Sequence, residues 1–283
     1  MNCYNCESYK ISFVNGNVRD IPEISIRQCD DCGLVFLDSF EHINNKFYEE
    51  SKMRESEEMS VEQWELSTQA DDQRRFKLLK GLCTEKDIMD FGAGNGGFLK
   101  LIKSVANSTL AIELDLEAHE IYEKHRISYY NSLDNLAKES KFDVITAFHV
   151  IEHLKDPVGF LKNLGEFLRD DGSIFLEFPN SRDALLSLFQ SSAFANFTYW
   201  SCHLMLFDED NIKQIIKKAG LKAHNVEQIQ RYPLSNHLFW LSKQKPGGHE
   251  KWSFLNSETL EREYERILGS QGMCDTIMVE VRK

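Results

Sequence analysis

The sequence predicts an α/β protein with a mostly parallel sheet and a small cysteine-rich module in front of it. Three observations carry this prediction. A strand pattern runs into a glycine-rich turn and a helix start over residues 88–99. Strand and helix patterns then alternate to the end of the chain, which is typical of a parallel sheet. Two Cys-x2-Cys pairs lie within the first 32 residues.

The cysteine-rich module comes first along the chain. Cys3 and Cys6 form one pair, and Cys29 and Cys32 form the other. Such pairs are typical of a four-cysteine zinc site, because the short loop lets both thiolates face one metal. Disulfides or free thiols are the alternative, and the lack of an evident export signal argues against disulfides. We therefore expect a zinc ribbon over residues 1–40, with strands near 10–14, 23–28 and 34–37.

A helical linker and the main domain follow the ribbon. Residues 41–80 are polar, rich in acids and helical in pattern, and we expect two or three helices there. Residues 81–283 form the main domain, with a helix over 210–218 that ends at Gly220. Residues 232–272 are an insertion on the substrate side. The expected strands are 87–91, 109–113, 128–131, 142–148, 172–178, 223–231 and 276–282.

The glycine-rich turn predicts a pocket for a nucleotide-like ligand. Glycines at 92, 94 and 96 let the backbone approach a ligand closely, and the next helix presents free N–H groups. The motif alone is ambiguous, because Gly92, Gly94 and Gly97 also fit the dinucleotide fingerprint, with Glu113 where a ribose-binding acid belongs. Asp90 favours S-adenosylmethionine (SAM): a carboxylate there would repel a pyrophosphate but tolerates a sulfonium and an ammonium.

Two long segments add a family resemblance. Residues 142–157 and 160–180 resemble the fourth strand, helix and fifth strand of class I SAM-dependent methyltransferases, and the resemblance covers about 87–283. It implies a seven-stranded Rossmann-like sheet with an antiparallel last strand. The expected SAM-binding residues are Asp90, Gly92, Ala93, Gly94, Asn95, Gly96, Glu113, Leu114, Ser132, Phe148 and His149.

Candidate catalytic residues lie where the fourth strand ends, at the sheet edge where ligands bind. Methyl transfer to a hydroxyl or to a carbon beside a ketone requires a base. We expect His153 to be that base and Glu152 to orient it, with His149 on the same helical face. The same three residues could instead bind a divalent cation, as in some ubiquinone-pathway O-methyltransferases that resemble this segment, or simply pack the turn. His203 and Tyr48 are further candidates for the site.

The insertion predicts contacts to the methyl acceptor. Its residues 245–249 combine glycines, a cation and an imidazole, which suits a phosphate, and its aromatic rings suit a sugar-like ring. A surface turn between two helices is the alternative. The candidate substrate residues are Arg231, His237, Trp240, Lys245 and His249.

The whole arrangement resembles the zinc-containing sugar C-methyltransferases and related enzymes of surface-polysaccharide synthesis. In those enzymes a ketone activates the neighbouring carbon, a histidine removes its proton, and a tyrosine after the ribbon helps bind substrate. The resemblance implies these roles for His153 and Tyr48, beside the acid Glu152. The expected activity is SAM-dependent methylation of a small metabolite, a sugar or nucleotide-sugar, at carbon or oxygen.

Composition and charge limit the classes of partner that the protein is expected to bind. The net charge of −12 and the few basic residues in 1–40 disfavour nucleic acid, which needs clustered Lys and Arg. An RNA methyltransferase that grips RNA with its ribbon is the alternative, and a SAM-binding protein without turnover is a third possibility. No apolar run is long enough for a membrane span, and we expect a cytoplasmic protein. The sequence does not give the oligomeric state.

Overall fold

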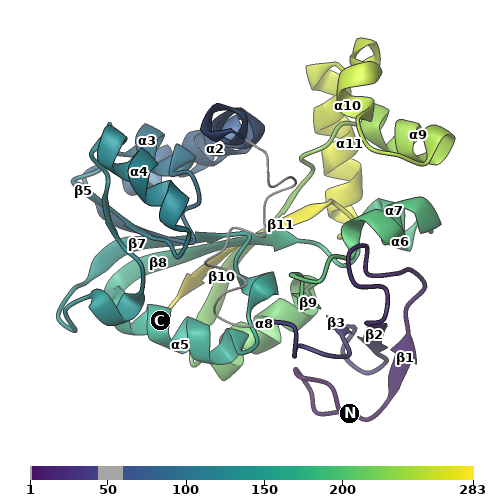
Figure 1. Ribbon diagram of the computed structural model, residues 1–283, viewed down its shortest axis with the longest axis horizontal. Coiled ribbons are helices and arrows are strands. Elements are labelled where there is room, and N and C mark those ends of the chain that lie inside the picture. The colour runs from purple at the N-terminus through teal and green to yellow at the C-terminus, as the bar shows by residue number, and fades with distance from the viewer. Residues whose placement is uncertain (1, 44–59) are drawn as a thin grey trace.

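A seven-stranded mixed sheet forms the centre of the computed structural model (Figure 1), which describes residues 2–43 and 60–283. All neighbouring strands are parallel except β11, which runs antiparallel to both of its neighbours. This confirms the seven strands and the antiparallel last strand. The order across the sheet is β10 (Lys222–Ile229), β11 (Thr276–Arg282), β8 (Leu168–Pro179), β7 (Phe142–Phe148), β4 (Asp87–Phe91), β5 (Ser108–Ile112) and β6 (Ser128–Tyr130).

The predicted strands agree with the structure to within a few residues. The largest difference is β8, which begins at Leu168 rather than at Gly172. Helix α5 ends at Phe167, and Leu168 already pairs with Phe142 of β7. The charged residues Arg169–Asp171 hide this early start. The solvent-exposed beginning of a strand need not alternate apolar and polar residues, so no sequence pattern marks it.

Helices cover both faces of the sheet (Figure 1). One group of helices consists of α2 (Val61–Cys83), α3 (Gly97–Ile102) and α4 (Leu116–His125). Its apolar side chains, such as Leu79, Phe98 and Tyr122, form one core with the sheet. The other group is α5 (Pro157–Phe167) and α8 (Glu209–Lys218), and its side chains, such as Leu161 and Ile212, form a second core with the sheet.

The N-terminal module forms a second, four-stranded sheet. Its strands β1 (Ile11–Phe13), β2 (Ile26–Cys29) and β3 (Val35–Leu37) match the predicted positions. The fourth strand, β9 (Met205–Leu206), comes from the main part of the chain and pairs with β3. The sequence did not predict it, because a two-residue strand has no periodicity. Buried residues of the module pack into the same hydrophobic core as β8 and α8. This core is therefore continuous between the N-terminal module and the main domain.

The predicted linker is described only at residues 41–43 and from residue 60 onward. Helix α2 begins after a capping box in which Ser60 and Gln63 satisfy each other's backbone N–H groups. It then continues unbroken for 23 residues. Tyr48 and the rest of 44–59 lie outside the described residues.

The remaining elements surround the carboxyl edge of the sheet. The insertion is helical, and the turn at Lys245–His249 joins two of its helices, as in the alternative interpretation. These elements are η1 (Leu133–Asn135), η2 (Ile151–His153), α6 (Ala184–Ser187), α7 (Ser192–Thr198), α9 (Leu234–Lys243), α10 (Gly248–Lys251), η3 (Ser253–Leu255) and α11 (Glu258–Ser270). Within residues 2–43 and 60–283, no helix has both the length and the apolar character that a bilayer span requires.

Candidate active site

The glycine-rich turn joins β4 to α3 in the conformation that its glycines allow. Gly92, Gly94 and Gly96 all have positive φ angles, of 70°, 54° and 70°, which side chains with a Cβ rarely adopt. Gly96 is needed for packing rather than for the pocket, because a Cβ there would lie 2.9 Å from the ring of Tyr122. Gly96 lines neither of the cavities described below, unlike the other two glycines.

Glu113 lies directly after β5 and faces this turn. Its carboxylate accepts hydrogen bonds from the backbone N–H of Gly94 at 2.7 Å and from that of Asp115 at 2.9 Å. Burial raises the pKa of Glu113, although these N–H groups act in the opposite direction. The side chain is thereby fixed at the end of the sheet, where it lines the larger cavity described below.

Asp90, at the end of β4, is almost fully buried and has one neutral hydroxyl partner. Thr146 donates to its Oδ1 at 2.6 Å. Burial raises the pKa of Asp90 to about 7, against the effect of this hydrogen bond. A buried carboxylate of this kind is poised to meet a cation.

Two adjoining cavities lie at this edge of the sheet. The smaller has a volume of about 240 Å³ and extends below Gly94 to Asp90. The larger is a cleft of about 2020 Å³ that begins at Gly92 and Glu113 and continues under the insertion. Of the predicted SAM-binding residues, the smaller cavity is lined by Asp90, Gly92, Ala93, Gly94, Asn95, Phe148 and His149, and the cleft by Gly92, Gly94, Glu113, Leu114, Ser132 and His149.

The turn after β7 brings the predicted catalytic trio together. Glu152 is completely buried between two histidines: its Oε1 lies 3.3 Å from Nδ1 of His149 and 3.9 Å from Nε2 of His153. Neither carboxylate oxygen has a well-aligned hydrogen bond to the described part of the chain. His153 lines the cleft, whereas Glu152 lies behind it.

His153 is held by the segment that follows α7. Its Nδ1 lies 2.8 Å from the backbone carbonyl oxygen of Cys202. A carbonyl can only accept, so Nδ1 carries the proton, and in the neutral ring Nε2 carries the lone pair. The orientation expected of a general base is therefore present.

His149 is in a different electrostatic situation. Its Nδ1 faces Glu152, and its Nε2 lies 3.4 Å from Oε1 of Glu177. Burial alone would lower the pKa of His149, but the two carboxylates raise it. The two carboxylates therefore favour the protonated ring, whereas burial and the guanidinium of Arg231, 3.3 Å from Nε2, oppose it. The backbone φ of His149 is an unusual 54°.

A buried cluster of charged residues, which the sequence did not predict, lies beside His149. Glu177 of β8 is fully buried and accepts hydrogen bonds from Arg74 and Arg75 of α2 at 2.6–3.0 Å. Burial would raise the pKa of Glu177, but Arg75, His149 and Arg74 hold it well below its usual value. The signal was present in the sequence, because Glu177 interrupts the apolar run Ile174–Phe178.

Arg231, after β10, is already paired. Its guanidinium donates to both carboxylate oxygens of Asp71, at 3.0 Å for Nε, and lies 3.3 Å from Nε2 of His149. Its backbone N–H and that of Tyr232 donate to Asp275. Arg231 lines both cavities, but Asp71 already neutralises its charge.

His203 lies behind the cleft wall. Its ring centre is 5.1 Å from that of His153, and burial followed by the nearby His153 lowers the pKa of His203 to about 3. It is not among the residues that line the cleft. Together with Cys202, these two histidines offer ligand atoms within 4.8 Å of one another, a spacing also found in metal sites.

The insertion supplies the far wall of the cleft. Trp240, His237 and His249 line it, and His237 is fixed by Tyr264, whose hydroxyl lies 2.6 Å from Nδ1. Burial lowers the pKa of His237 to about 4, so its ring is neutral. Lys245 is exposed on the surface turn and does not line the cleft.

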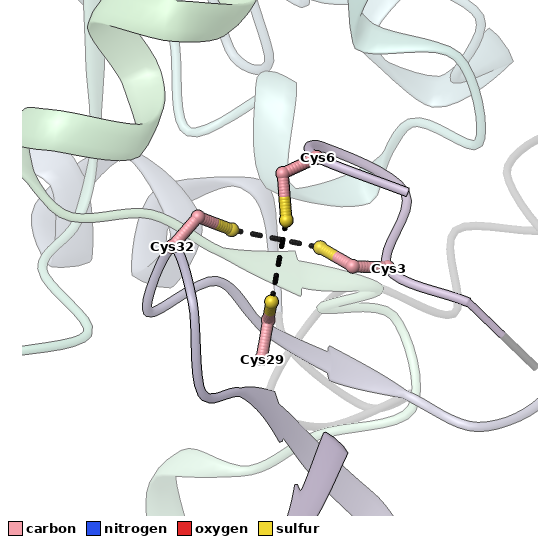
Figure 2. Close-up of side chains that lie close together, drawn as sticks. All are labelled: Cys3, Cys6, Cys29 and Cys32. Carbon is pink, nitrogen blue, oxygen red and sulfur yellow. Dashed lines mark hydrogen bonds between the residues drawn. The ribbon is translucent and has the colours of Figure 1, made fainter. Parts of the chain in front are cut away.

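The four N-terminal cysteines converge on one point (Figure 2). The sulfur atoms of Cys3 and Cys32 lie 3.5 Å apart, and those of Cys6 and Cys29 lie 3.4 Å apart. In each of these two pairs, the cysteines lie on opposite sides of a common centre (Figure 2). Tetrahedral zinc bound at 2.3 Å would separate its sulfur ligands by about 3.8 Å, so small outward shifts would create the site.

Comparison with known proteins identifies the family and the fold of the chain. A family model described as a methyltransferase domain matches residues 64–226, which is more than half of the chain. A Mycobacterium tuberculosis protein described as a probable S-adenosylmethionine-dependent methyltransferase is 28% identical over 109 residues. That match covers 37% of this chain and 40% of the relative's length.

Two further comparisons extend over more of the chain. A ubiquinone biosynthesis O-methyltransferase of Xanthomonas campestris is 26% identical over 180 residues, covering 59% of this chain and 73% of that protein. The crystal structure of a SAM-dependent methyltransferase from Thermotoga maritima aligns with a TM-score of 0.53 at 18% identity. The alignment covers 87% of this chain and all of that one.

Proposed function

We propose that this chain, which belongs to the methyltransferase domain family, uses SAM to methylate a sugar or nucleotide-sugar at carbon or oxygen, with His153 as general base. The observation that carries the base assignment is the Nδ1 hydrogen bond from His153 to the carbonyl of Cys202. It leaves Nε2 as the basic nitrogen of a residue on the cleft wall.

The cofactor fits the two cavities by charge and by size. SAM supplies an activated methyl group on a sulfonium. Glu113 would hold its ribose hydroxyls, and Asp90 would compensate the positive charge of its methionine part. The cleft of about 2020 Å³ exceeds the roughly 300–1,000 Å³ of an ordinary ligand pocket, so it has room for cofactor and acceptor together.

His149 would assist without acting as a base. Glu152 and Glu177 favour its protonated form, and it links the catalytic turn to α2 through Glu177. Its positive charge also compensates that of the buried Glu152 carboxylate. Glu152 would therefore remain ionised beside His153 and stabilise the imidazolium that forms when His153 accepts a proton.

An acceptor with both flat and charged parts suits the cleft. Trp240 lines the cleft with an apolar ring suited to a sugar, and His249 lines it with an imidazole. Both ring nitrogens of His237 already meet Tyr264 and Gln230, so His237 shapes this wall. Arg19 of the N-terminal module also lines the cleft, and its guanidinium lies 4.1 Å from the ring centre of Trp200. Among the described residues it pairs with no carboxylate, so it could meet a phosphate of a nucleotide-sugar, a role that Arg231 and Lys245 are less able to fill.

Zinc would hold the N-terminal module together. The convergence of Cys3, Cys6, Cys29 and Cys32 supports a structural ion, since four thiolates without an open position are typical of structural zinc. In this proposal zinc takes no part in the transfer step.

The proposal is tested by a mass-spectrometric assay for S-adenosylhomocysteine. The protein is incubated with SAM and either a panel of nucleotide-sugars that includes keto-sugars, or bulk RNA, with Glu113→Ala as the cofactor-site control. We expect turnover with a sugar, a product heavier by one methylene, and little product from the control. Turnover with RNA alone would overturn the substrate class in favour of an RNA methyltransferase.

A further inference from the structure

We propose that the N-terminal module sets the orientation of His153 through the segment 199–204, with Asp20 as the positioning residue. This inference rests on the proposed role of His153 as the base. It gives the module a catalytic purpose that differs from binding the acceptor: the module fixes the peptide group to which the base is hydrogen-bonded.

The module holds the outer side of the segment 199–204. Asp20 accepts two hydrogen bonds from Ser201, from the backbone N–H at 3.0 Å and from the hydroxyl at 2.6 Å. The backbone N–H of Arg19 donates to the carbonyl of Tyr199 at 2.9 Å, and that of Leu37 donates to the carbonyl of Leu204 at 3.0 Å. Nε2 of His42 lies 2.8 Å from the carbonyl oxygen of Ser201.

The inner side of the same segment holds the catalytic turn. The carbonyl of Cys202 accepts the Nδ1 hydrogen bond of His153 at 2.8 Å. The backbone N–H of Leu204 donates to the carbonyl of Glu152, also at 2.8 Å. Ser201 and Cys202 are completely buried, so this short stretch is fixed from both sides.

The segment needs this support because it has little regular structure of its own. It lies between α7 and β9 and contains one internal turn, from the N–H of His203 to the carbonyl of Trp200. Ser201 directly precedes Cys202, so a shift of Ser201 moves the carbonyl that His153 contacts. Without that acceptor the proton of the imidazole can occupy either nitrogen, and part of the population loses a basic Nε2.

The chain offers a matched control for Asp20. Asp30 is another exposed carboxylate of the module, and it accepts a hydrogen bond from the hydroxyl of Ser12 at 2.7 Å, within the module itself. Asp20→Ala and Asp30→Ala therefore each remove one exposed carboxylate of the module, with two hydrogen bonds lost in the first and one in the second. Only the first loosens the segment 199–204.

The primary test is nitrogen-15 NMR of the histidine rings in the full chain. The His153 signals are assigned by their loss in His153→Gln. In the wild type we expect the pattern of a ring protonated at Nδ1, unchanged in Asp30→Ala. In Asp20→Ala we expect the two ring nitrogens to move toward a common averaged shift, and Ser201→Ala, which keeps the backbone hydrogen bond, should show a smaller change. An unchanged His153 pattern in both Asp20→Ala and Ser201→Ala overturns the inference, and the second variant decides alone if the first does not fold.

The rate test separates this inference from the proposed function. With a keto-sugar acceptor that turns over, Asp20→Ala should lower kcat about 10- to 100-fold, since small misplacements of a catalytic group cost this much, while the SAM Kd is unchanged. In a His153→Gln background the same change should cost nothing further, which a general structural effect would not produce. A wild-type rate in His153→Gln overturns the proposed base, whereas an additional loss from Asp20→Ala in that background overturns the positioning role.

Discussion

The backbone N–H of Gly94 and the carboxylate of Glu113 are joined across the mouth of the cofactor pocket by a hydrogen bond of 2.7 Å. The contact joins the turn after β4 to the end of β5, two neighbouring strands of the sheet. It orients an acid that is partly exposed at the edge of the cleft. The glycine-rich turn thus fixes Glu113, the proposed ribose-binding residue, through its own backbone.

Removing this partner should weaken the binding of SAM. We expect Glu113→Ala to raise the SAM Kd about 10- to 100-fold, because hydrogen bonds to charged groups contribute about 1.5–3 kcal/mol each. Gly94→Ala should act in the same direction, since alanine rarely adopts a φ of 54°. Isothermal titration calorimetry measures both. Glu120→Ala, on the exposed side of α4, is the control, and unchanged affinity in both site variants would remove the pocket from this turn.

The binding of SAM should also depend on the ionisation of Asp90. Burial raises the pKa of this carboxyl to about 7, and a cationic ligand binds best to the ionised form. Below pH 7 the proton competes with SAM, so the Kd should rise by up to about tenfold for each unit of pH. Asp90→Asn should bind SAM weakly and lose this part of the pH dependence. Calorimetric titrations between pH 5.5 and 8 compare the two proteins, and parallel curves would argue against Asp90 as the contact.

Loss of the proposed base should affect the transfer step and not the cofactor. We expect His153→Ala to lower turnover about 10²- to 10⁴-fold, the usual contribution of general base catalysis, with the SAM Kd retained. Release of S-adenosylhomocysteine measures the rate. His203→Ala is the comparison, because His203 lies behind the cleft wall. A larger loss in that variant than in His153→Ala would move the base to His203.

The cysteine cluster should hold one zinc ion per chain. Metal analysis of freshly purified protein should find about one equivalent, and Cys29→Ser should lose it. Zinc loss should increase proteolysis within residues 1–40 more than within the large sheet, because all four thiolates lie in the module. The core and the β-sheet that the module shares with the main part of the chain remain without zinc. The scattered Cys83, changed to serine, is the control. Protein purified without zinc yet resistant to protease would contradict the structural role.

A buried pair of acids should make stability depend on pH. Burial and the nearby Asp275 raise the pKa of Asp183 from 3.8 to about 8. The folded state therefore binds a proton that the unfolded state has released, and stability falls as pH rises from about 4 through about 8. Asp183→Asn keeps the acceptor for the N–H of Leu185 and avoids the buried charge. Its melting temperature should exceed that of the wild type by about 2–4 °C more at pH 8 than at pH 5.5, taking about 1 kcal/mol of relief. A constant difference across this range would show that Asp183 does not titrate there.

Much of the fold could be predicted because its signals are local. Strands such as β4 and β7 are short apolar runs bounded by turn residues, and their predicted limits agree with the structure. The glycine-rich turn and Glu113 are separated by one helix and one strand, so the parallel sheet itself brings them together. The pairing of β3 with β9 could not be predicted in this way, since its two strands are separated by about 170 residues.

The candidate site shows the same difference between local signals and long-range contacts. His149, Glu152 and His153 are close in sequence, so their proximity was predictable, but their protonation was not. Long-range partners decide it: Glu177 for His149 and the carbonyl of Cys202 for His153. Arg231 is the clearest case of a misleading local signal, because Asp71, far away in sequence, already neutralises it.

The sequence by itself determined that the chain builds a Rossmann-like sheet with a glycine-rich turn after β4, and that four cysteines could gather in its N-terminal module. These are consequences of residue type and spacing, which act over one or two elements. Only the tertiary structure decided that the module pairs with β9, that α2 supplies the arginines for Glu177, and that Asp20 reaches the segment beside His153. Those contacts depend on which distant surfaces pack together, and burial among them sets the charge and orientation of each side chain in the site.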